Sequence, residues 1–379
     1  MFKMPERITL DNAAAFESEL LEAQPETLDA AELTYISSVG LRVLLKLFKK
    51  IGKKPVIENV SPEVYEIFEA TGFIDLAEIH KRIREVSIEG LEVLGHGSNG
   101  DVYRLDDERI IKVYNAPWLR GKPDKAKGES EISREVFKSG ISTAISFDIV
   151  KCGENYAAIY EIIKGRTLGE EISDHPEKLE DMIALLAEAG RQLHHTKASP
   201  EYFPDILKKF KSDGKKLDNI WKDDAEKEKW AALADAIPHR QNMVHTDFHY
   251  DNVMVQNNEP VLIDVGGICA GHPVFDFMTM YLRATRPGLA ATRFPAETEK
   301  KIFDIYIDRY FEGRLNEENK KLLLKVFEWI GNNVLLVIGI KKSAFKDDKV
   351  LRSMAESILS IEPDELKSAF DVLDKELFV

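Results

Sequence analysis

The stretch HTDFHYDNVMVQNNEPVLIDVGG, residues 245–267, constrains the fold more than any other part of the chain, because it predicts a β-hairpin with polar side chains at one end. Two short β-branched runs, Val253–Val255 and Val261–Val265, flank a polar segment of turn-forming residues. Asn252 precedes the first run and Asp264 lies near the exit of the second. Antiparallel pairing of the two strands would therefore bring Asn252 and Asp264 towards the same end.

Asp247 lies on the loop that enters this hairpin. Together with Asn252 and Asp264 it offers carboxylate and amide oxygens, which suit a hard cation such as Mg²⁺ that is shared with substrate phosphates. Turn formation and helix capping also explain these residue types, so the pattern alone leaves both interpretations open. His245 and His249 flank Asp247, but they lack the helical spacing of a zinc motif.

Composition excludes several classes of protein. The 379 residues are enough for two or three domains, and a formal net charge of −14 disfavours nonspecific binding to nucleic acid or to a membrane surface. The two cysteines, Cys152 and Cys269, lie far apart, which argues for a reducing compartment and against a disulfide framework. The first residues lack the apolar core of a signal peptide, and no apolar run approaches bilayer-spanning length. We therefore expect a cytoplasmic protein with no nucleic-acid or membrane partner.

Residues 1–84 alternate short apolar runs with amphipathic helical patterns. Strands are predicted around Thr27–Ala31 and Pro55–Asn59. Between them, residues 41–48 place leucines and a phenylalanine at helical spacing. This alternation predicts a small α/β domain with a sheet covered by helices.

The segments YISSVGLRVLLKLFKK and PVIENVSPEVYEIFEATGFIDL make this domain resemble the STAS family, the domain of anti-sigma-factor antagonists and sulfate-transporter tails. In that family a short Asp-Ser-Ser/Thr-Gly-Leu segment opens a helix, and a partner kinase phosphorylates its first serine. Ser38 matches this phosphosite, while Ser37 stands in place of the Asp. Either serine also suits a helix cap, and the helix dipole would tolerate a phosphate there. The resemblance implies a regulatory module that binds a protein partner.

A charged bridge at residues 81–86 leads into GLEVLGHGSNGDVYRLDDERIIKVY. Strands predicted over 91–94 and 101–105 enclose a GxGxxG pattern, which would form a hairpin tip rather than open a Rossmann helix. The glycines are Gly95, Gly97 and Gly100. The next strand carries Lys112, which needs an anionic partner such as a nucleotide phosphate if it is buried. Plain turn glycines and an outward-facing edge lysine are the alternatives.

A helix predicted over Glu129–Ser139 bears two further acids, Glu131 and Glu135. Two apolar strands follow it. At the end of the second strand, Glu161 and Ile162 can offer backbone groups to the edge of an adenine, although a simple turn would show the same sequence.

These motifs occur in the order glycine loop, strand Lys, helix Glu, His-x-Asp-x4-Asn and Asp. With GHPVFDF, they make residues 88–379 resemble the protein-kinase-like fold, in the variant of the aminoglycoside phosphotransferase and choline kinase family. The resemblance implies an α+β bilobal domain, with a small β-rich lobe over 85–163 and a large helical lobe over 164–379. This domain would follow the α/β STAS-like domain of residues 1–84.

The resemblance also assigns roles. Asp247 would be the catalytic base, and Asn252 and Asp264 would hold Mg²⁺. Lys112 would contact the α and β phosphates and pair with Glu135, which fits the family position better than Glu131. Supporting roles fall to the backbone N–H groups of Gly95, Gly97 and Gly100 near the phosphates, to His245 as a brace of the loop, and to Asp276 as its hydrogen-bond acceptor.

Two positions depart from the family pattern. Val265 stands where an aromatic residue usually follows the metal-binding Asp, and Gly267 stands where many relatives have an acid. Neither removes a metal ligand or the base, so we expect an active enzyme.

The function implied is transfer of the γ-phosphoryl group of ATP, or of another nucleoside triphosphate, to a hydroxyl of a small molecule. The alternative is a signalling protein whose kinase-like lobe binds nucleotide or phosphorylates a protein serine such as Ser38, and which acts through partner binding. The complete base and metal set favours catalysis, and the small-molecule type of catalytic loop favours the first function. No residue set after Leu179 specifies the acceptor.

Overall fold

The computed structural model describes residues 1–215, 217, 220–286, 292–341 and 348–378. The chain divides into two compact units, Met1–Glu89 with Ile149–Glu154, and Gly90–Asp148 with Asn155–Val379. The segment Ile149–Glu154 belongs to the first unit through the backbone of Lys151. Its N–H donates to the carbonyl of Arg84 at 2.9 Å, and its carbonyl accepts from the N–H of Val86 at 2.8 Å.

The first unit is an α/β domain built on a parallel sheet of order β1-β3-β5-β6. Its strands are β1 (Phe2–Lys3), β3 (Thr27–Asp29), β5 (Val56–Val60) and β6 (Glu78–Lys81), with β2 (Arg7–Ile8) and β4 (Tyr35–Ile36) as a separate parallel pair. Its helices are α1 (Ala13–Ala23), α2 (Ser38–Ile51), α3 (Pro62–Ala70) and the 3₁₀ turn η1 (Phe73–Asp75). The helices bury their apolar faces against the sheet, as the alternation of runs predicts.

Helix α2 begins with a cap that distinguishes the two serines. Ser37 is the N-cap, and its hydroxyl accepts from the N–H of Gly40 at 3.4 Å. Gly40 allows a close approach, since a Cβ there would lie 2.6 Å from Ile8 and 2.7 Å from Ile36. Ser38 is the first residue of the helix, and its side chain is exposed.

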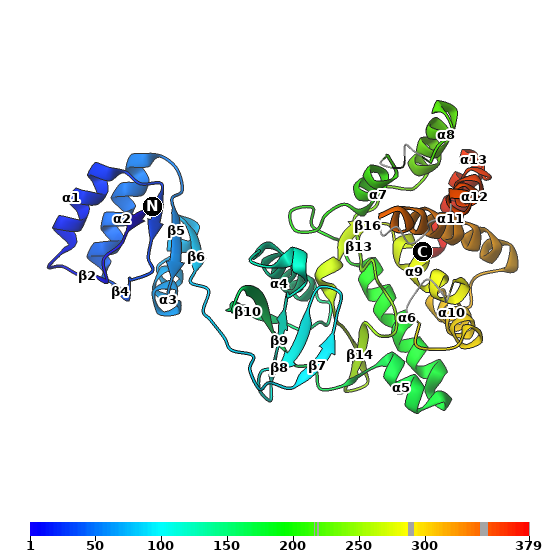
Figure 1. Ribbon diagram of the computed structural model, residues 1–379, viewed down its shortest axis with the longest axis horizontal. Helices are drawn as coiled ribbons and strands as arrows, with labels where there is room; N and C mark the ends of the chain where they lie inside the picture. The colour runs from blue at the N-terminus through cyan, green and yellow to red at the C-terminus, as the bar shows by residue number, and fades with distance from the viewer. Residues whose placement is uncertain (216, 218–219, 287–291, 342–347, 379) are drawn as a thin grey trace. The chain divides into compact units, whose positions relative to one another are not determined.

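The chain after Gly90 begins with a small lobe built on a five-stranded sheet of order β10-β11-β9-β8-β7, whose strand β10 runs into the segment Ile149–Glu154. Its strands are β7 (Val93–His96), β8 (Asp101–Arg104), β9 (Arg109–Val113), β10 (Ser146–Cys152) and β11 (Asn155–Glu161). The 3₁₀ turn η2 (Pro117–Leu119) precedes α4 (Asp124–Lys138), which packs beside the sheet (Figure 1). Helix α4 starts at Asp124, five residues before the predicted helix.

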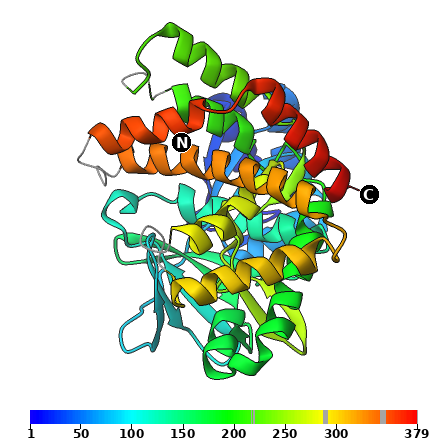
Figure 2. The same cartoon turned by 90° about the vertical axis from the view of Figure 1, so that its right-hand side faces the viewer.

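The large lobe is mainly helical. It contains α5 (Leu168–Asp174), η3 (Pro176–Lys178), α6 (Leu179–His195), α7 (Ile206–Lys215), α8 (Asp224–Asp235), α9 (Val274–Thr285), α10 (Ala296–Tyr310), α11 (Glu317–Lys341), α12 (Asp348–Leu359) and α13 (Pro363–Leu377). Its short strands and turn are β12 (Arg166–Thr167), β13 (Asn242–Val244), β14 (Val253–Gln256), β15 (Glu259–Leu262), η4 (Val265–Gly267) and β16 (Cys269–Gly271). Helix α9 packs between α10 and α11 (Figure 2). None of the helices in the described ranges has the length and apolar character of a bilayer span.

Strands β14 and β15 form the predicted antiparallel hairpin. The turn residues Asn257 and Asn258 have φ values of 54° and 64°, and positive φ at both positions is what a two-residue type I′ turn requires. The second strand ends at Leu262 rather than at Val265, because Asp264 takes a left-handed conformation with φ 54° and ψ 38°. This conformation turns the chain out of the hairpin immediately beside its entry.

Candidate active site

The Asp276 side chain of α9 holds the start of the loop between β13 and β14. The Asp276 carboxylate is fully buried and accepts from the N–H groups of His245 at 2.7 Å and of Thr246 at 2.6 Å. His194 contacts the same carboxylate at 3.0 Å. Thr246 has a φ of 70°, a conformation that costs free energy in a β-branched residue and that these bonds offset.

His245 ties this loop to the end of the hairpin. Its Nε2 lies 3.1 Å from the carbonyl oxygen of Ile263, and the N–H of Ile263 donates to the carbonyl of Asn252 at 3.0 Å. The second of these contacts joins the residue before β14 to the residue that follows β15. Asn252 and Asp264 therefore lie at the same end of the hairpin, as the sequence predicts.

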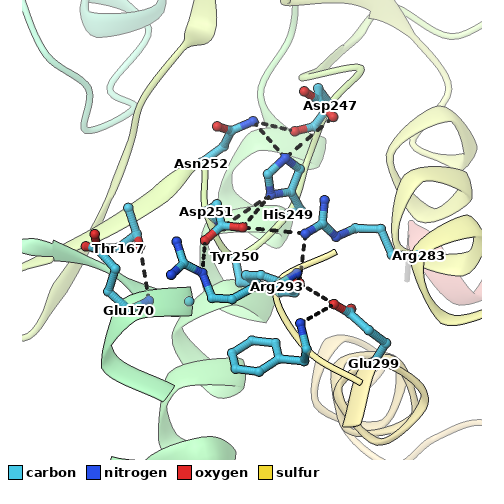
Figure 3. Close-up of polar contacts among 12 residues, drawn as sticks. Thr167, Glu170, Asp247, His249, Tyr250, Asp251, Asn252, Arg283, Arg293 and Glu299 are labelled. Carbon is cyan, nitrogen blue, oxygen red and sulfur yellow. Dashed lines mark hydrogen bonds and ion pairs between the residues drawn. The ribbon is translucent and has the colours of Figure 1, made fainter. Parts of the chain in front are cut away.

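Asp247 stands on the exposed side of the loop, with two-thirds of its side chain open to solvent. The amide nitrogen of Asn252 donates to the Asp247 carbonyl at 2.8 Å, and His249 Nε2 lies 3.6 Å from Asp247 Oδ1 (Figure 3). Desolvation opposes ionisation, but the interaction with His249 and the nearby charges lower the pKa of Asp247 below its usual value. The carboxylate is therefore ionised at neutral pH.

The far end of the loop is held by residues that the sequence interpretation passed over. Asp251 accepts from Arg293 Nε at 2.8 Å and lies 3.5 Å from Arg283 Nη2, which also donates to the hydroxyl of Tyr250 at 2.7 Å (Figure 3). The N–H of Gly169 in α5 donates to the carbonyl of Tyr250 at 3.1 Å. The sequence shows Asp251 as an acid within the motif HTDFHYDN, but it does not show the partners, because Arg283 and Arg293 lie in distant segments.

Lys112 joins the small lobe to the hairpin. Its Nζ lies 2.9 Å from Glu129 Oε2 and 2.6 Å from Asp264 Oδ1. Strand β9 lies between β8 and β11, so the alternative of an outward-facing lysine on an edge strand is excluded. Burial opposes the charge of Lys112, but Glu129 and Asp264 raise its pKa above the ordinary value. Burial likewise opposes ionisation of Asp264, whereas Lys112 lowers the pKa of this carboxyl.

The predicted pairing of Lys112 with Glu135 is wrong. Glu135 instead pairs with Lys138 at 2.7 Å, and Glu131 is exposed. Glu129 lies six residues earlier on α4, and six residues at 3.6 per turn, about one and two-thirds turns, separate the two side chains onto different faces. Glu129 lies on the buried face of α4 together with Ala126 and Ser133, and it is 5% exposed.

The glycine loop forms the predicted tip of the β7–β8 hairpin. The N–H of Gly97 donates to the carbonyl of Gly100 at 2.8 Å, which closes the turn. Gly100 is required by packing, because a Cβ there would lie 1.8 Å from the carbonyl oxygen of Val113. Gly95 lies within β7, and a side chain at this position would meet no described atom within 4 Å.

At the end of β11, where the sequence predicts contacts with an adenine, two backbone N–H groups already donate hydrogen bonds within the protein. The N–H of Glu161 donates to the carbonyl of Ile145 at 3.0 Å, and the N–H of Ile162 donates to the carbonyl of Glu108 at 2.8 Å. These two donors are therefore not free to bind an adenine, and only other groups of this exit could do so.

Comparison with known proteins identifies the second unit. Residues 90–336, more than half of the chain, match the model of the phosphotransferase enzyme family. The chain belongs to the phosphotransferase enzyme family. Residues 1–86 match the STAS domain, so the predicted order of a STAS domain followed by a kinase-like phosphotransferase domain is confirmed. No curated protein matches the chain.

Solved structures that are similar to this chain include two kinds of phosphotransferase. The ADP-bound aminoglycoside phosphotransferase APH(2'')-Ib is 20% identical, with 79% of this chain and 98% of that chain covered and a TM-score of 0.49. A choline/ethanolamine kinase family protein from Mesorhizobium loti is 16% identical, with 75% and 92% covered and a TM-score of 0.49.

The corrected ion pair in the phosphotransferase domain gives a stability prediction. Glu129→Gln leaves Lys112 and Lys125 with less compensation in a buried place and is expected to destabilise the domain by about 3 kcal/mol. The matched change Glu135→Gln removes only a local pair with Lys138 and should cost less than about 1 kcal/mol. Urea unfolding followed by tryptophan fluorescence measures both, because every tryptophan lies in the second unit: Trp118, Trp221, Trp230 and Trp329. Equal losses of unfolding free energy in the two variants would contradict the pairing of Lys112 with Glu129.

Gly266 gives a second prediction for the phosphotransferase domain. A Cβ at Gly266 would lie 2.3 Å from Glu129 Cγ, so Gly266→Ala must displace the Glu129 side chain or move α4 away from η4. We expect a loss of about 1–3 kcal/mol by the same unfolding measurement. Gly267→Ala is the control, because its Cβ would lie 3.2 Å from the Thr246 hydroxyl, and it should stay within about 1 kcal/mol of wild type. A neutral Gly266→Ala variant would contradict the close packing of Glu129 on η4.

Proposed function

We propose that the phosphotransferase domain transfers the γ-phosphoryl group of ATP to a hydroxyl group of a small molecule. The observation that carries the proposal is the contact of Lys112 with Asp264 at 2.6 Å. Asp264 follows Ile263, whose N–H donates to the carbonyl of Asn252, and the loop before Asn252 presents Asp247. A cation on a strand, a metal-binding acid and a base on one loop are the parts that phosphoryl transfer needs.

The side chains present suit Mg²⁺. The amide nitrogen of Asn252 is engaged by the Asp247 carbonyl, which leaves its oxygen as a hard ligand, and the Asp264 side chain is about half exposed. Bound there with a nucleotide, Mg²⁺ would neutralise charge on the phosphates. Within the described ranges, no group of three or more His, Cys, Asp or Glu side chains could hold a metal ion.

The remaining roles follow from charge and exposure. Lys112 is held as a cation by Glu129, and it would donate to the phosphates that approach Asp264. Asp247 is ionised and open to solvent, so it can accept the proton of an acceptor hydroxyl. The transition state of phosphoryl transfer is loose, and positioning with charge neutralisation therefore carries most of the rate.

A phosphorus NMR assay tests this function. The 379-residue chain is incubated with MgATP and separate pools of hydroxyl compounds: amino alcohols, sugars and aminoglycosides. We expect ADP and a new phosphomonoester resonance in one pool, lost in Asp247→Ala. Formation of ADP and inorganic phosphate alone in every pool would contradict a small-molecule acceptor among these classes.

A second candidate rests on the first turn of α2. Because Ser37 provides the cap, the exposed Ser38 is not needed to begin the helix. This observation favours a signalling protein that phosphorylates a protein serine such as Ser38 and acts through a partner of the STAS domain. Intact-mass measurement after incubation with MgATP should then show one added phosphate, absent in Ser38→Ala. An unchanged mass of the wild-type protein would exclude phosphorylation of Ser38 by this chain.

A further inference from the structure

A buried tyrosine contacts the acid that holds Lys112. Tyr114 follows β9, is fully buried, and donates its hydroxyl to Glu129 Oε2 at 2.6 Å. Lys112 donates to the same oxygen at 2.9 Å. Lys112 and Tyr114 are two residues apart, so both point to the same face of the extended chain. The strand therefore presents a cation and a neutral donor to one carboxylate oxygen.

The other contacts of Glu129 help the Tyr114 hydroxyl to hold its carboxylate in one orientation. The second oxygen, Oε1, lies 2.7 Å from Lys125, and Gly266 packs against the carbon atoms of the side chain. Burial raises the pKa of Tyr114 above its ordinary value, so the hydroxyl stays protonated and acts as a donor. Together these contacts leave the carboxylate of Glu129 one orientation.

The same hydroxyl reaches a third element. Tyr114 Oη lies 3.3 Å from the hydroxyl of Tyr160 in β11, one residue before Glu161. Burial raises the pKa of Tyr160 to about 12, so this group is also neutral. The contact connects Glu129 of α4 with the strand exit that precedes the large lobe.

We propose that Tyr114 is a positioning residue of the phosphotransferase, which fixes Glu129 on Lys112 when Asp264 binds the metal ion. The inference rests on the proposed function. Lys112 has two carboxylate partners, Glu129 and Asp264. A metal ion bound to Asp264 would weaken the attraction between Asp264 and Lys112. Glu129 then becomes the remaining protein anchor of Lys112, and the Tyr114 hydroxyl prevents its carboxylate from rotating away.

A double-mutant cycle tests the proposal through the Kd for MgATP, measured calorimetrically on the 379-residue chain. Tyr114→Phe keeps the ring and removes one hydrogen bond to a charged group, so we expect the Kd to rise about tenfold. The rise should be smaller for ATP in excess chelator, because Asp264 then remains on Lys112. In a Glu129→Gln background, the same change should have little further effect, since the two residues act as one unit.

Tyr306→Phe is the matched control. Tyr306 is also fully buried, and its hydroxyl has no hydrogen-bond partner within the described ranges, so its removal should leave the Kd unchanged. A Tyr114→Phe variant with the wild-type Kd, or with an equal rise in the Glu129→Gln background, would overturn the positioning role even if its unfolding midpoint fell. Failure of the wild-type protein to bind MgATP would instead overturn the proposed function itself.

Discussion

Replacing Asp264 with alanine is expected to abolish MgATP turnover. Asp264 is the only carboxylate assigned to the metal, and charge that neutralises the transferring phosphoryl group is worth on the order of 10³ or more in rate. Turnover is measured as ADP formation with the acceptor found in the pools described above. Lys112 keeps Glu129 as a partner in this variant, so the domain should still fold.

The control for Asp264→Ala is Asp106→Ala. Asp106 lies on the β8–β9 turn, where it pairs with Arg109. Removing this partly exposed carboxylate tests the loss of one negative charge from the same domain without touching the site, and turnover should remain near the wild-type value. Wild-type turnover in Asp264→Ala would show that the metal is held elsewhere.

Replacing Asp247 with alanine should lower turnover while leaving nucleotide binding intact. General-base catalysis contributes a factor of about 10² to 10⁴, and the metal and phosphate contacts assigned to Asn252, Asp264 and Lys112 do not use the Asp247 side chain. The measurement is a pair of values for each protein: kcat at saturating acceptor, and the Kd for MgATP. A fall in kcat with an unchanged Kd is expected.

Two other results for Asp247→Ala would contradict the account. A wild-type kcat would remove Asp247 from the chemistry. A large rise in the Kd would give it a role in the metal site, which its position does not predict, because the Asp247 contact to Asn252 is made by the backbone carbonyl.

The local parts of the site could be predicted because their signals lie within short stretches. Asn257 and Asn258 between two β-branched runs fix a tight hairpin, and a tight hairpin brings Asn252 and Asp264 together whatever the rest of the fold. The end of the second strand was misplaced by three residues, because the β-branched run does not show that Asp264 takes a left-handed conformation, in which its side chain contacts Lys112.

The choice of Glu135 failed for a tertiary reason. Helix α4 carries four acids, Asp124, Glu129, Glu131 and Glu135. Which of them faces inward depends on how the helix packs against the sheet and η4, and the sequence alone does not give this packing. A signal was nevertheless present: Glu129 lies in a stripe of small and apolar buried positions at helical spacing, formed by Ala126, Ser130, Ser133 and Val136. An acid in such a stripe must face the interior and needs a cationic partner.

The position of Tyr114 beside Lys112 could be predicted from the sequence, but the partners of its hydroxyl could not. The run IIKVY places Lys112 and Tyr114 on one face of a strand, but the partner of the hydroxyl comes from α4 and from β11. The same holds for Asp251, whose arginine partners come from α9 and from the segment before α10. Side chains that act through distant partners are defined only by the fold.

Thermal unfolding of the wild-type protein with ATP, in the presence and absence of Mg²⁺, tests the central claim most directly. A ligand that binds only the folded state raises the midpoint by mass action, and tryptophan fluorescence follows the phosphotransferase domain alone. We predict a rise with ATP that is clearly larger when Mg²⁺ is present, and we expect this Mg²⁺-dependent part to disappear in Asp264→Ala. An unchanged midpoint at millimolar MgATP would contradict a metal–nucleotide site formed by Lys112, Asn252 and Asp264.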